Sequence, residues 1–404
     1  MISQPSPFLA IPDGWRMKKL KYVASLKSGE SITSDEIADS GEYPVYGGNG
    51  LRGYTSKYTH SGHYVLIGRQ GALCGNVNYA SGRFWASEHA VVASIRDEVD
   101  VTWLGELLRA MDLNQYSQSA AQPGIAVDVI GNLELPVPPL DEQHAIAKFL
   151  SGETARIDTL VASKQYLLTL LAEKRKALIT SAVSRGLDPN VPTKPSGISW
   201  LERVPAHWEV KRAKWLFRER DERTTTGEEV LLSLRMERGL VPHNDVSEKQ
   251  TIPLELVGYK KVAPTQIVVN RMRAASGLVA IATRDGLVSP DYAVFQCAPD
   301  IDPDYYVHLF KTELLQAVFR SESTGLGTGS SGFLRLYSES FLSLWFPCPP
   351  LKEQRDIVKR ISQEASELDS LRSATERSVS LLKERRTALI KAAVTGQIEV
   401  NATR

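Results

Sequence analysis

The sequence lacks the features that mark several large protein classes. It has only three cysteines in 404 residues, Cys74, Cys297 and Cys348, at wide spacing and with no C-x-x-C pair. This excludes a disulfide framework or a zinc knuckle and predicts ordinary buried thiols. No apolar run approaches the length of about 18 residues that a membrane span needs, and the N-terminus has no basic segment followed by an apolar one. We therefore expect a soluble, cytoplasmic protein without a membrane span.

The sequence also has almost no net charge and lacks the common catalytic motifs. It carries 48 basic and 47 acidic residues, for a net charge of +1, so the whole-chain charge neither requires nor excludes a nucleic-acid partner. The phosphate-binding motif G-x-x-x-x-G-K-[ST], the zinc motif H-E-x-x-H and the nucleophile motif G-x-S-x-G are missing. The only close histidine pair, His60 and His63, has no neighbouring set of ligands. We expect no catalytic residues and no metal site in this chain.

One segment matches the letters of a dinucleotide-binding motif. Residues 327–332 fit G-x-G-x-x-G, but they lie in a Ser/Gly-rich loop after a helical stretch, whereas a dinucleotide site needs this motif between a strand and a helix. We interpret the segment as a loop that contacts a ligand or polyanion.

An internal repeat organises the chain. The sequence around Pro138-Pro139-Leu140, with Glu142 and Gln143, recurs 211 positions later with Glu353 and Gln354, and the match continues without a gap for some fifty residues. A shorter match, offset by 193, joins the segments that begin at Pro12 and Pro205. The material between the matched ends shows no obvious similarity. The chain therefore reads as two unlike segments, each followed by a copy of one constant segment.

The constant segments have the periodicity of long helices. Apolar residues recur at spacings of three and four from Leu140 to Val183, without an interior proline, and Gly186 and Gly396 lie where the two helices should stop. Such a helix is roughly 65 Å long at 1.5 Å per residue, and its apolar stripe needs a partner. We expect the two copies to pair as an intramolecular antiparallel coiled coil; the alternative is that each helix packs on its neighbouring domain.

The variable segments, 12–135 and 200–346, have the texture of mixed α/β domains with short strands, many loops and one late helical stretch each, 101–111 and 305–319. The predicted class is α+β with a pseudo-two-fold arrangement. The predicted domains are 1–139, a first long helix at 140–186, a proline-rich extended linker at 187–199, a second domain at 200–350, and a second long helix with a C-terminal tail at 351–404.

Several polar residues of the variable segments have the chemistry to read DNA bases. Arginine reads a guanine edge with two hydrogen bonds, and asparagine or glutamine reads adenine in the same way. Neither segment is basic overall, with 11 basic against 14 acidic residues over 11–135 and 17 against 18 over 204–346. The alternative is that each is a solvated or ion-paired side chain. The candidate DNA-binding residues are Tyr46, Asn49, Arg52, Arg69, Gln70, Arg83, Asn270, Arg271, Arg273 and Arg335.

These features together resemble the DNA-specificity subunit of Type I restriction–modification systems. The resemblance rests on the alternation of segments, the P-x-P-P-L-x-E-Q sequence at 136–143 and 347–354, the Pro-Trp-Lys entries at 12–18 and 205–211, and the glycine loops 46–50 and 68–71.

The resemblance implies that each variable domain is a target-recognition domain for one half of a split, asymmetric DNA site. It also implies that the helices set the gap and dock two methyltransferase subunits, with Glu142, Gln143, Glu353 and Gln354 as partner-binding residues. Restriction subunits would join the complex. S-adenosylmethionine, ATP and magnesium would be used by the partner subunits and none of them by this chain.

Two alternatives stay open. A self-contained methyltransferase or nuclease would need a glycine-rich S-adenosylmethionine loop and an Asn/Asp-Pro-Pro-Tyr/Phe tetrapeptide, neither of which is present. A coiled-coil adaptor that binds other proteins would select no sequence from a random duplex library.

Overall fold

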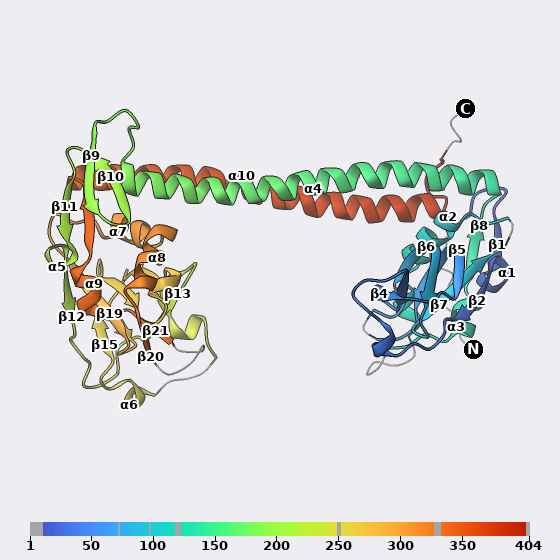
Figure 1. The fold of residues 1–404 in the computed structure, drawn as a ribbon, viewed down its shortest axis with the longest axis horizontal. Helices are drawn as coiled ribbons and strands as arrows, with labels where there is room; N and C mark the ends of the chain where they lie inside the picture. Colours follow the sequence, from blue (N-terminus) through green and yellow to red (C-terminus); the bar gives the residue numbers. More distant parts are fainter. Residues whose placement is uncertain are drawn as a thin grey trace. The chain divides into compact units, whose positions relative to one another are not determined.

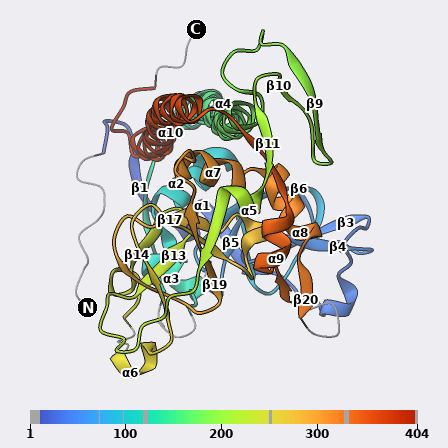
Figure 2. The same ribbon diagram turned by 90° about the vertical axis from the view of Figure 1, so that its left-hand side faces the viewer.

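The computed structural model describes residues 11–71, 73–96, 98–117, 123–248, 252–326 and 333–400. The chain divides into two compact units. Unit 1 comprises Met1–Tyr166 with Thr375–Arg404, and unit 2 comprises Leu167–Ala374, so each unit contains part of both long helices (Figures 1 and 2). In the described residues, no helix has the length and apolar character to cross a membrane.

The two long helices form where the periodicity predicts them. Helix α4 spans Leu140–Arg185 and helix α10 spans Leu351–Val394. The glycines that follow, Gly186 and Gly396, have left-handed φ values of +79° and +72°, a conformation that glycine adopts without the steric cost of a side chain. The predicted helices and their glycine stops are confirmed.

The helices pack against each other in opposite directions. In unit 1, Ile146 near the start of α4 shares a core with Val394 at the end of α10. In unit 2, Val183 near the end of α4 shares a core with Ile357 near the start of α10. Figure 2 shows the two helices side by side. The expected antiparallel pairing is confirmed.

Two ion pairs display the pseudo-two-fold symmetry of this pairing. In unit 1, Arg386 Nε donates to Asp158 Oδ1 at 2.9 Å, and in unit 2, Arg175 Nη2 donates to Asp369 Oδ2 at 3.4 Å. Each partner is 211 residues from its equivalent in the other pair. Because the pairs are exposed, each contributes at most about 1 kcal/mol to stability. Their equivalence shows that the two helices meet in the same register in both units.

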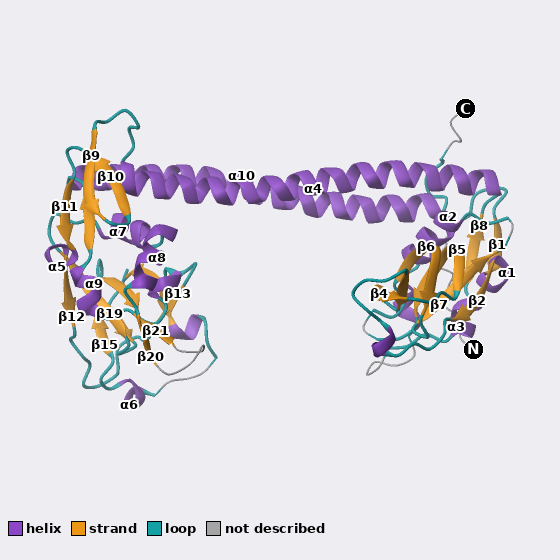
Figure 3. Cartoon of the chain, viewed as in Figure 1, coloured by secondary structure: helices purple, strands orange, loops and turns teal. Residues whose placement is uncertain are grey.

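Unit 1 carries a six-stranded sheet in the order β2-β7-β5-β6-β3-β4, in which only β3 and β6 pair in parallel. Figure 3 shows strands of this sheet in orange. Helix α2 packs on this sheet through the buried Trp103, and the Asp100 side chain caps the helix by accepting from the backbone of Trp103. The elements are β1 (Arg16–Lys19), α1 (Leu20–Val23), β2 (Ala24–Ser28), η1 (Ser34–Glu36), β3 (Tyr43–Gly47), β4 (Gly50–Thr55), β5 (His60–Gly68), β6 (Val77–Ala86), β7 (Ala90–Ile95), α2 (Val101–Ala110), η2 (Leu113–Tyr116), α3 (Val127–Gly131) and β8 (Glu134–Val137).

Unit 2 is built differently, from a four-stranded sheet in the order β12-β19-β16-β17 and several two-stranded sheets. Its elements are β9 (Thr193–Ile198), β10 (Leu201–Pro205), β11 (Glu209–Arg212), α5 (Ala213–Leu216), β12 (Phe217–Arg220), β13 (Leu232–Arg235), β14 (Gly239–Pro242), η3 (His243–Asp245), α6 (Pro253–Leu256), β15 (Lys260–Val262), β16 (Ile267–Asn270), η4 (Ala274–Ser276), β17 (Val279–Ile281), β18 (Gly286–Val288), β19 (Tyr292–Cys297), α7 (Pro303–Phe310), α8 (Glu313–Ser321), β20 (Thr324–Leu326), β21 (Phe333–Arg335), α9 (Ser338–Ser343) and β22 (Trp345–Cys348).

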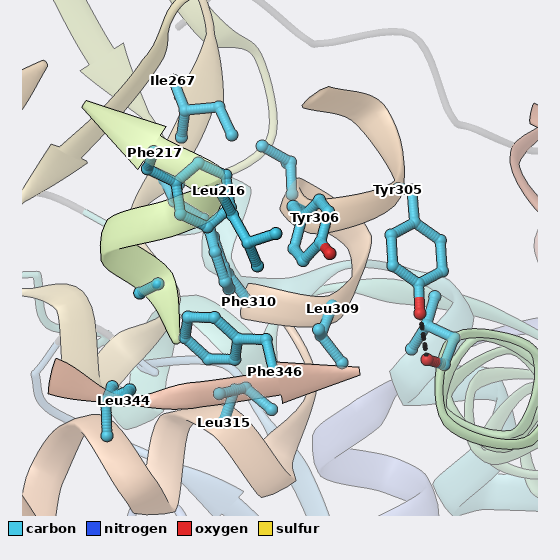
Figure 4. Packing of buried hydrophobic residues seen from close by; sticks show 14 of the residues in the cluster. Leu216, Phe217, Ile267, Tyr305, Tyr306, Leu309, Phe310, Leu315, Leu344 and Phe346 are labelled. Carbon is cyan, nitrogen blue, oxygen red and sulfur yellow. Dashed lines mark hydrogen bonds between the residues drawn. The ribbon is translucent and has the colours of Figure 1, made fainter. Parts of the chain in front are cut away.

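An aromatic core attaches the second domain to the helices. Phe217 contacts the rings of Tyr306, Phe310 and Phe346, with centroids 5.0 to 6.3 Å apart. The neighbouring Tyr305 is fully buried and donates its hydroxyl to the carbonyl oxygen of Val183 in α4 at 2.7 Å (Figure 4). Tight aromatic packing and this buried hydrogen bond hold α7 against α4 within unit 2.

A glutamine at the start of each long helix forms the same hydrogen-bonded contact with its variable domain in both units. We call this contact the joint. Gln143 accepts from the backbone of Asp100 at 2.9 Å and donates to the carbonyl oxygens of Pro138 and Glu98. Gln354, 211 residues later, accepts from the backbone of Asp302 at 2.8 Å and donates to the equivalent carbonyls. Both side chains are buried, at 1% and 0% exposure. The hydrogen bonds of these two glutamines therefore involve only backbone atoms of the variable domain.

We expect Gln354→Ala to lower the free energy of unfolding of unit 2 by about 1 to 3 kcal/mol, because it leaves buried backbone groups without partners. Chemical denaturation followed by tryptophan fluorescence measures this. The matched control is Gln363→Ala, which removes an exposed glutamine from the same helix and should change little. Equal stabilities for the two variants would contradict the structural role of Gln354.

Two stretches differ from the sequence-based prediction. The stretch expected to be an extended linker, 187–199, contains strand β9, which pairs with β10 in a hairpin. Prolines are tolerated there because a two-stranded sheet has only edge strands. The expected helical stretch 305–319 is two helices: α7 ends at Phe310 with Lys311 as its C-cap, and Thr312 caps α8 by accepting from the backbone of Leu315. Two of the three cysteines are buried and the third is half-buried, and all are free, as expected.

Candidate nucleic-acid interface

The structure brings the two glycine loops of unit 1 together. A Cβ atom on Gly68 would overlap the carbonyl oxygen of Gly48, and a Cβ atom on Gly48 would lie 3.2 Å and 3.3 Å from the carbonyl oxygens of His89 and Gln70. The backbones of the two loops therefore touch, which only glycine permits at these positions. Residues separated by about twenty positions in the sequence form one continuous surface.

Amide and imidazole side chains line this surface. Asn76 Nδ2 donates to Asn49 Oδ1 at 3.0 Å, and Gln70 Oε1 lies 3.0 Å from His89 Nδ1 in a hydrogen bond. Asn49, Gln70 and Asn76 are exposed and His89 is half-buried. Amide groups on an exposed surface can form the paired hydrogen bonds that distinguish adenine.

Two predicted arginines lie beside these loops. Arg69 is half-buried and donates from Nη1 to the Ser28 hydroxyl at 3.1 Å. Arg52 is exposed on β4 and lies over Gly47, whose Cβ position would be 3.1 Å from Arg52 Cγ. Both residues belong to the loop surface. Arg69 is hydrogen-bonded to Ser28 of the edge strand β2, and Arg52 lies on the hairpin of β3 and β4.

The remaining two candidates of unit 1 lie apart from this cluster of contacts. Tyr46 is half-buried and packs edge-on against Phe84, with ring centroids 5.7 Å apart. Arg83 is exposed and lies over the ring of Tyr58 at 5.0 Å, and its hydrogen bond to Tyr43 raises the pKa of the guanidinium. Tyr46 is therefore mainly a packing residue, whereas Arg83 has a free face.

In unit 2, the candidate DNA-binding residues lie at or beside the turn that follows β16. The Asn270 side chain accepts from the backbone of Met272 and Arg273 and so shapes the turn. The backbone of Arg271 accepts from Leu336, which brings β21 beside the turn. Burial raises the pKa of Tyr292, which faces Asn270 across the sheet. The Asn270 side-chain oxygen is thus engaged in stabilising its own turn in this conformation.

The arginines of unit 2 differ in how freely they could reach a ligand. Arg271 Nη2 pairs with Glu219 at 2.6 Å and is 16% exposed, and Arg335 Nη2 pairs with Asp291 at 3.2 Å and is 21% exposed. Arg273 is exposed and forms no ion pair with the residues that the structure describes. To contact a base, Arg271 and Arg335 would have to exchange a carboxylate for it, whereas Arg273 is already available. The DNA-binding role of all ten candidates stays a prediction.

The four residues predicted to bind partners divide into two kinds. Gln143 and Gln354 are the buried joint residues described above, so the structure gives them an internal role. Glu142 accepts from the indole of Trp15 at 3.0 Å, and Glu353 accepts at 2.7 Å from His207. These glutamates attach the entry of each variable domain to its long helix.

Sequence reasoning missed three polar residues at the loop surface of unit 1. Asn76 and His89 hydrogen-bond to predicted residues, and the buried Nδ2 atom of Asn78 has no hydrogen-bond partner within the described ranges. The alternation of Asn76 and Asn78 after the second glycine loop is the sequence pattern that could have identified these two asparagines.

The glycine-rich loop 327–332 lies outside the described residues. Among those residues, no three or more His, Cys, Asp or Glu side chains gather where they could hold a metal ion.

We expect Gly68→Ala to disturb recognition by unit 1 alone. The added methyl group would push the two loops apart, an overpacking that costs about 1 to 3 kcal/mol and corresponds to a roughly 5- to 150-fold loss of affinity if it falls on binding. Selection from randomised duplexes should show a weakened or altered half-site for unit 1 and an unchanged half-site for unit 2.

The control for this variant is Gly152→Ala, since a Cβ atom at that helical position meets nothing within 4 Å. It should leave both half-sites unchanged. An unchanged preference in Gly68→Ala would argue against the loop surface as a reader.

Comparisons with known proteins find similarity both in sequence and in fold. Residues 12–167 match the family described as the Type I restriction modification DNA specificity domain. The Type I restriction enzyme EcoprrI specificity subunit of Escherichia coli is 42% identical over 152 residues, 37% of this chain and 37% of that protein. A putative type I restriction enzyme specificity subunit of Haemophilus influenzae is 29% identical over 142 residues, 34% of this chain and 37% of that protein. The matches thus span little more than a third of these relatives.

A likeness in fold extends further than the sequence matches. A chain from a solved structure titled as the basis of complex assembly and conformational transition of the type I R-M system is similar with a TM-score of 0.68 at 15% identity. The similarity covers 96% of this chain and 100% of that chain. The fold, with two α/β domains and a pair of long helices, is therefore shared with that chain.

Proposed function

We propose that this chain, in which residues 12–167 match a Type I restriction–modification DNA specificity domain, is the sequence-recognition subunit of a Type I restriction–modification complex. Each variable domain reads one half of a bipartite, asymmetric DNA site, and the paired helices set the spacing. The chain itself is non-catalytic.

The observation that carries this proposal is the combination of like helices with unlike domains. The helices repeat down to the ion pairs Asp158–Arg386 and Arg175–Asp369, whereas the attached domains have a six-stranded and a four-stranded main sheet. A repeated scaffold that holds two different readers suits a site with two different halves. An enzyme or a symmetric adaptor would have no need of this asymmetry.

The proposed partners follow from the same repeat. Two equivalent long helices suit two copies of a methyltransferase subunit around one copy of this chain. Restriction subunits complete the complex, and S-adenosylmethionine, ATP and magnesium are used by these partners. The complex acts on double-stranded DNA in the cytoplasm.

The test is selection from a randomised duplex library by the full chain with its modification subunits, followed by methylome sequencing of cells that express them. We expect one bipartite motif with a fixed gap and methylated adenines in that motif. A binder that enriches no motif would favour the adaptor alternative, and methylation by this chain alone would favour the self-contained enzyme.

A further inference from the structure

A short basic segment recurs at the entry of each variable domain. We call residues 16–27 and 209–220 the basic segments; they correspond at an offset of 193. Four basic positions and one aromatic position have the same chemistry in both: Lys18, Lys19, Lys21, Lys27 and Tyr22 in unit 1, and Lys211, Arg212, Lys214, Arg220 and Trp215 in unit 2.

Positive charge is concentrated in these segments. The first holds 5 of the 11 basic residues of 11–135 and no acidic residue, although that stretch is acidic overall. The second holds 5 of the 17 basic residues of 204–346 and two acidic ones, Glu209 and Glu219. Both of these pair with cations, Glu209 with Lys211 at 2.7 Å and Glu219 with Arg271. Each variable domain therefore has a local positive surface against a neutral or acidic background.

The two basic segments also occupy the same elements. The first forms β1, α1 and β2, and the second forms β11, α5 and β12, and both β2 and β12 are edge strands of their sheets. Arg16, Lys18 and Lys27 are exposed in unit 1, as are Arg218 and Arg220 in unit 2. None of these five forms an ion pair with a residue that the structure describes, so their charges are available to a ligand.

An exposed aromatic ring supports one lysine in each segment. Tyr22 and Trp215 are 61% and 70% exposed. The Nζ atoms of Lys21 and Lys214 lie 5.4 Å and 5.3 Å from the centres of these rings. At such distances the ring face attracts the ammonium group, which favours one position for the charge.

Each basic segment leads directly into the candidate reading surface of its own unit. In unit 1, Ser28 at the end of β2 accepts from Arg69 of the glycine loop. In unit 2, Glu219 of β12 accepts from Arg271 of the reading turn. The basic segments are thus continuous with the proposed DNA interface in both units.

We propose that the two basic segments bind the phosphate backbone of duplex DNA at equivalent places in the two units, independently of base sequence. This inference rests on the proposed function. Phosphate contacts carry no sequence information, so the same contact can serve both halves of a site while the adjoining readers differ. The edge strands position the duplex, and the loops and turns beside them read it.

The test measures the salt dependence of binding of the full chain to a 40-base-pair duplex of random sequence. Each phosphate contact contributes a slope of about 0.9 in a plot of log affinity against log salt. We expect Lys21→Gln/Lys27→Gln and Lys214→Gln/Arg220→Gln each to reduce the slope by about 1.8, and the combined variant to reduce it by about twice that. Base preference in duplex selection should stay unchanged.

The matched control is Lys148→Gln/Lys174→Gln, which removes two exposed lysines from α4 and should leave the slope unchanged. An unchanged slope in the basic-segment variants would overturn the inference, as would a change of preference at single base positions. Normal DNA binding combined with loss of a co-expressed modification subunit would assign the surface to an acidic protein instead. If the unmodified chain binds no duplex and enriches no motif, the proposed function itself fails.

Discussion

Removal of seven residues from each long helix should shorten the gap between the two half-sites by about three base pairs and leave both half-sites unchanged. The deletions are 164–170 in α4 and the equivalent 375–381 in α10. Seven residues of helix span roughly 10.5 Å, and one base pair of duplex spans about 3.4 Å. Seven residues are also close to two full turns, so the apolar stripe keeps its face.

The effect on the original site should be large. A duplex with the original gap can no longer satisfy both readers, so its affinity should fall toward the non-specific level, a loss of about a thousandfold or more. Duplex selection measures the new gap, and competition binding measures the loss. The control replaces the same two heptads by other heptads of equal length, which should preserve the gap. An unchanged gap after the double deletion would show that the helices do not set the spacing.

The helical scaffold could be predicted from the sequence because a repeat is visible without any structure. The periodicity and the match at an offset of 211 predicted both helices and their antiparallel pairing, and the glycines at 186 and 396 predicted where they stop, all of which the structure reproduces. The register was not predictable from apolar spacing alone. It depends on which side chains meet, as Asp158 and Arg386 do.

The candidate site was predictable only in part, because its members meet through the fold of distant segments. The glycine loops were visible in the sequence, but their contact through Gly48 and Gly68 depends on sheet order. Asn270 has the right chemistry for a base reader, and yet its side chain accepts from its own turn. Gln143 belongs to a motif shared by both halves, and its repetition alone did not reveal that it is buried. Residue type shows what a side chain can do, whereas burial and neighbours decide its use.

Exchange of the first reading domain should switch one half-site and leave the other half-site and the gap unchanged. The structure suggests exchanging residues 20–133 for the equivalent segment of another specificity subunit, because this retains strands β1 and β8 at the joint. Affinity for the original site should fall by about a thousandfold or more, and a hybrid site with one new half should replace it. The reciprocal exchange in unit 2 should switch the other half-site.

The physical reason for expecting a clean exchange is the chemistry of the joint. Gln143 contacts backbone atoms of Pro138, Glu98 and Asp100, and Gln354 makes the same set of contacts in unit 2. Backbone groups are present whatever the side chains are, so a domain of unrelated sequence can make the same joint if its chain passes through the same place. Changes in both half-sites after one exchange would show that the readers are coupled and that the joint transmits more than position.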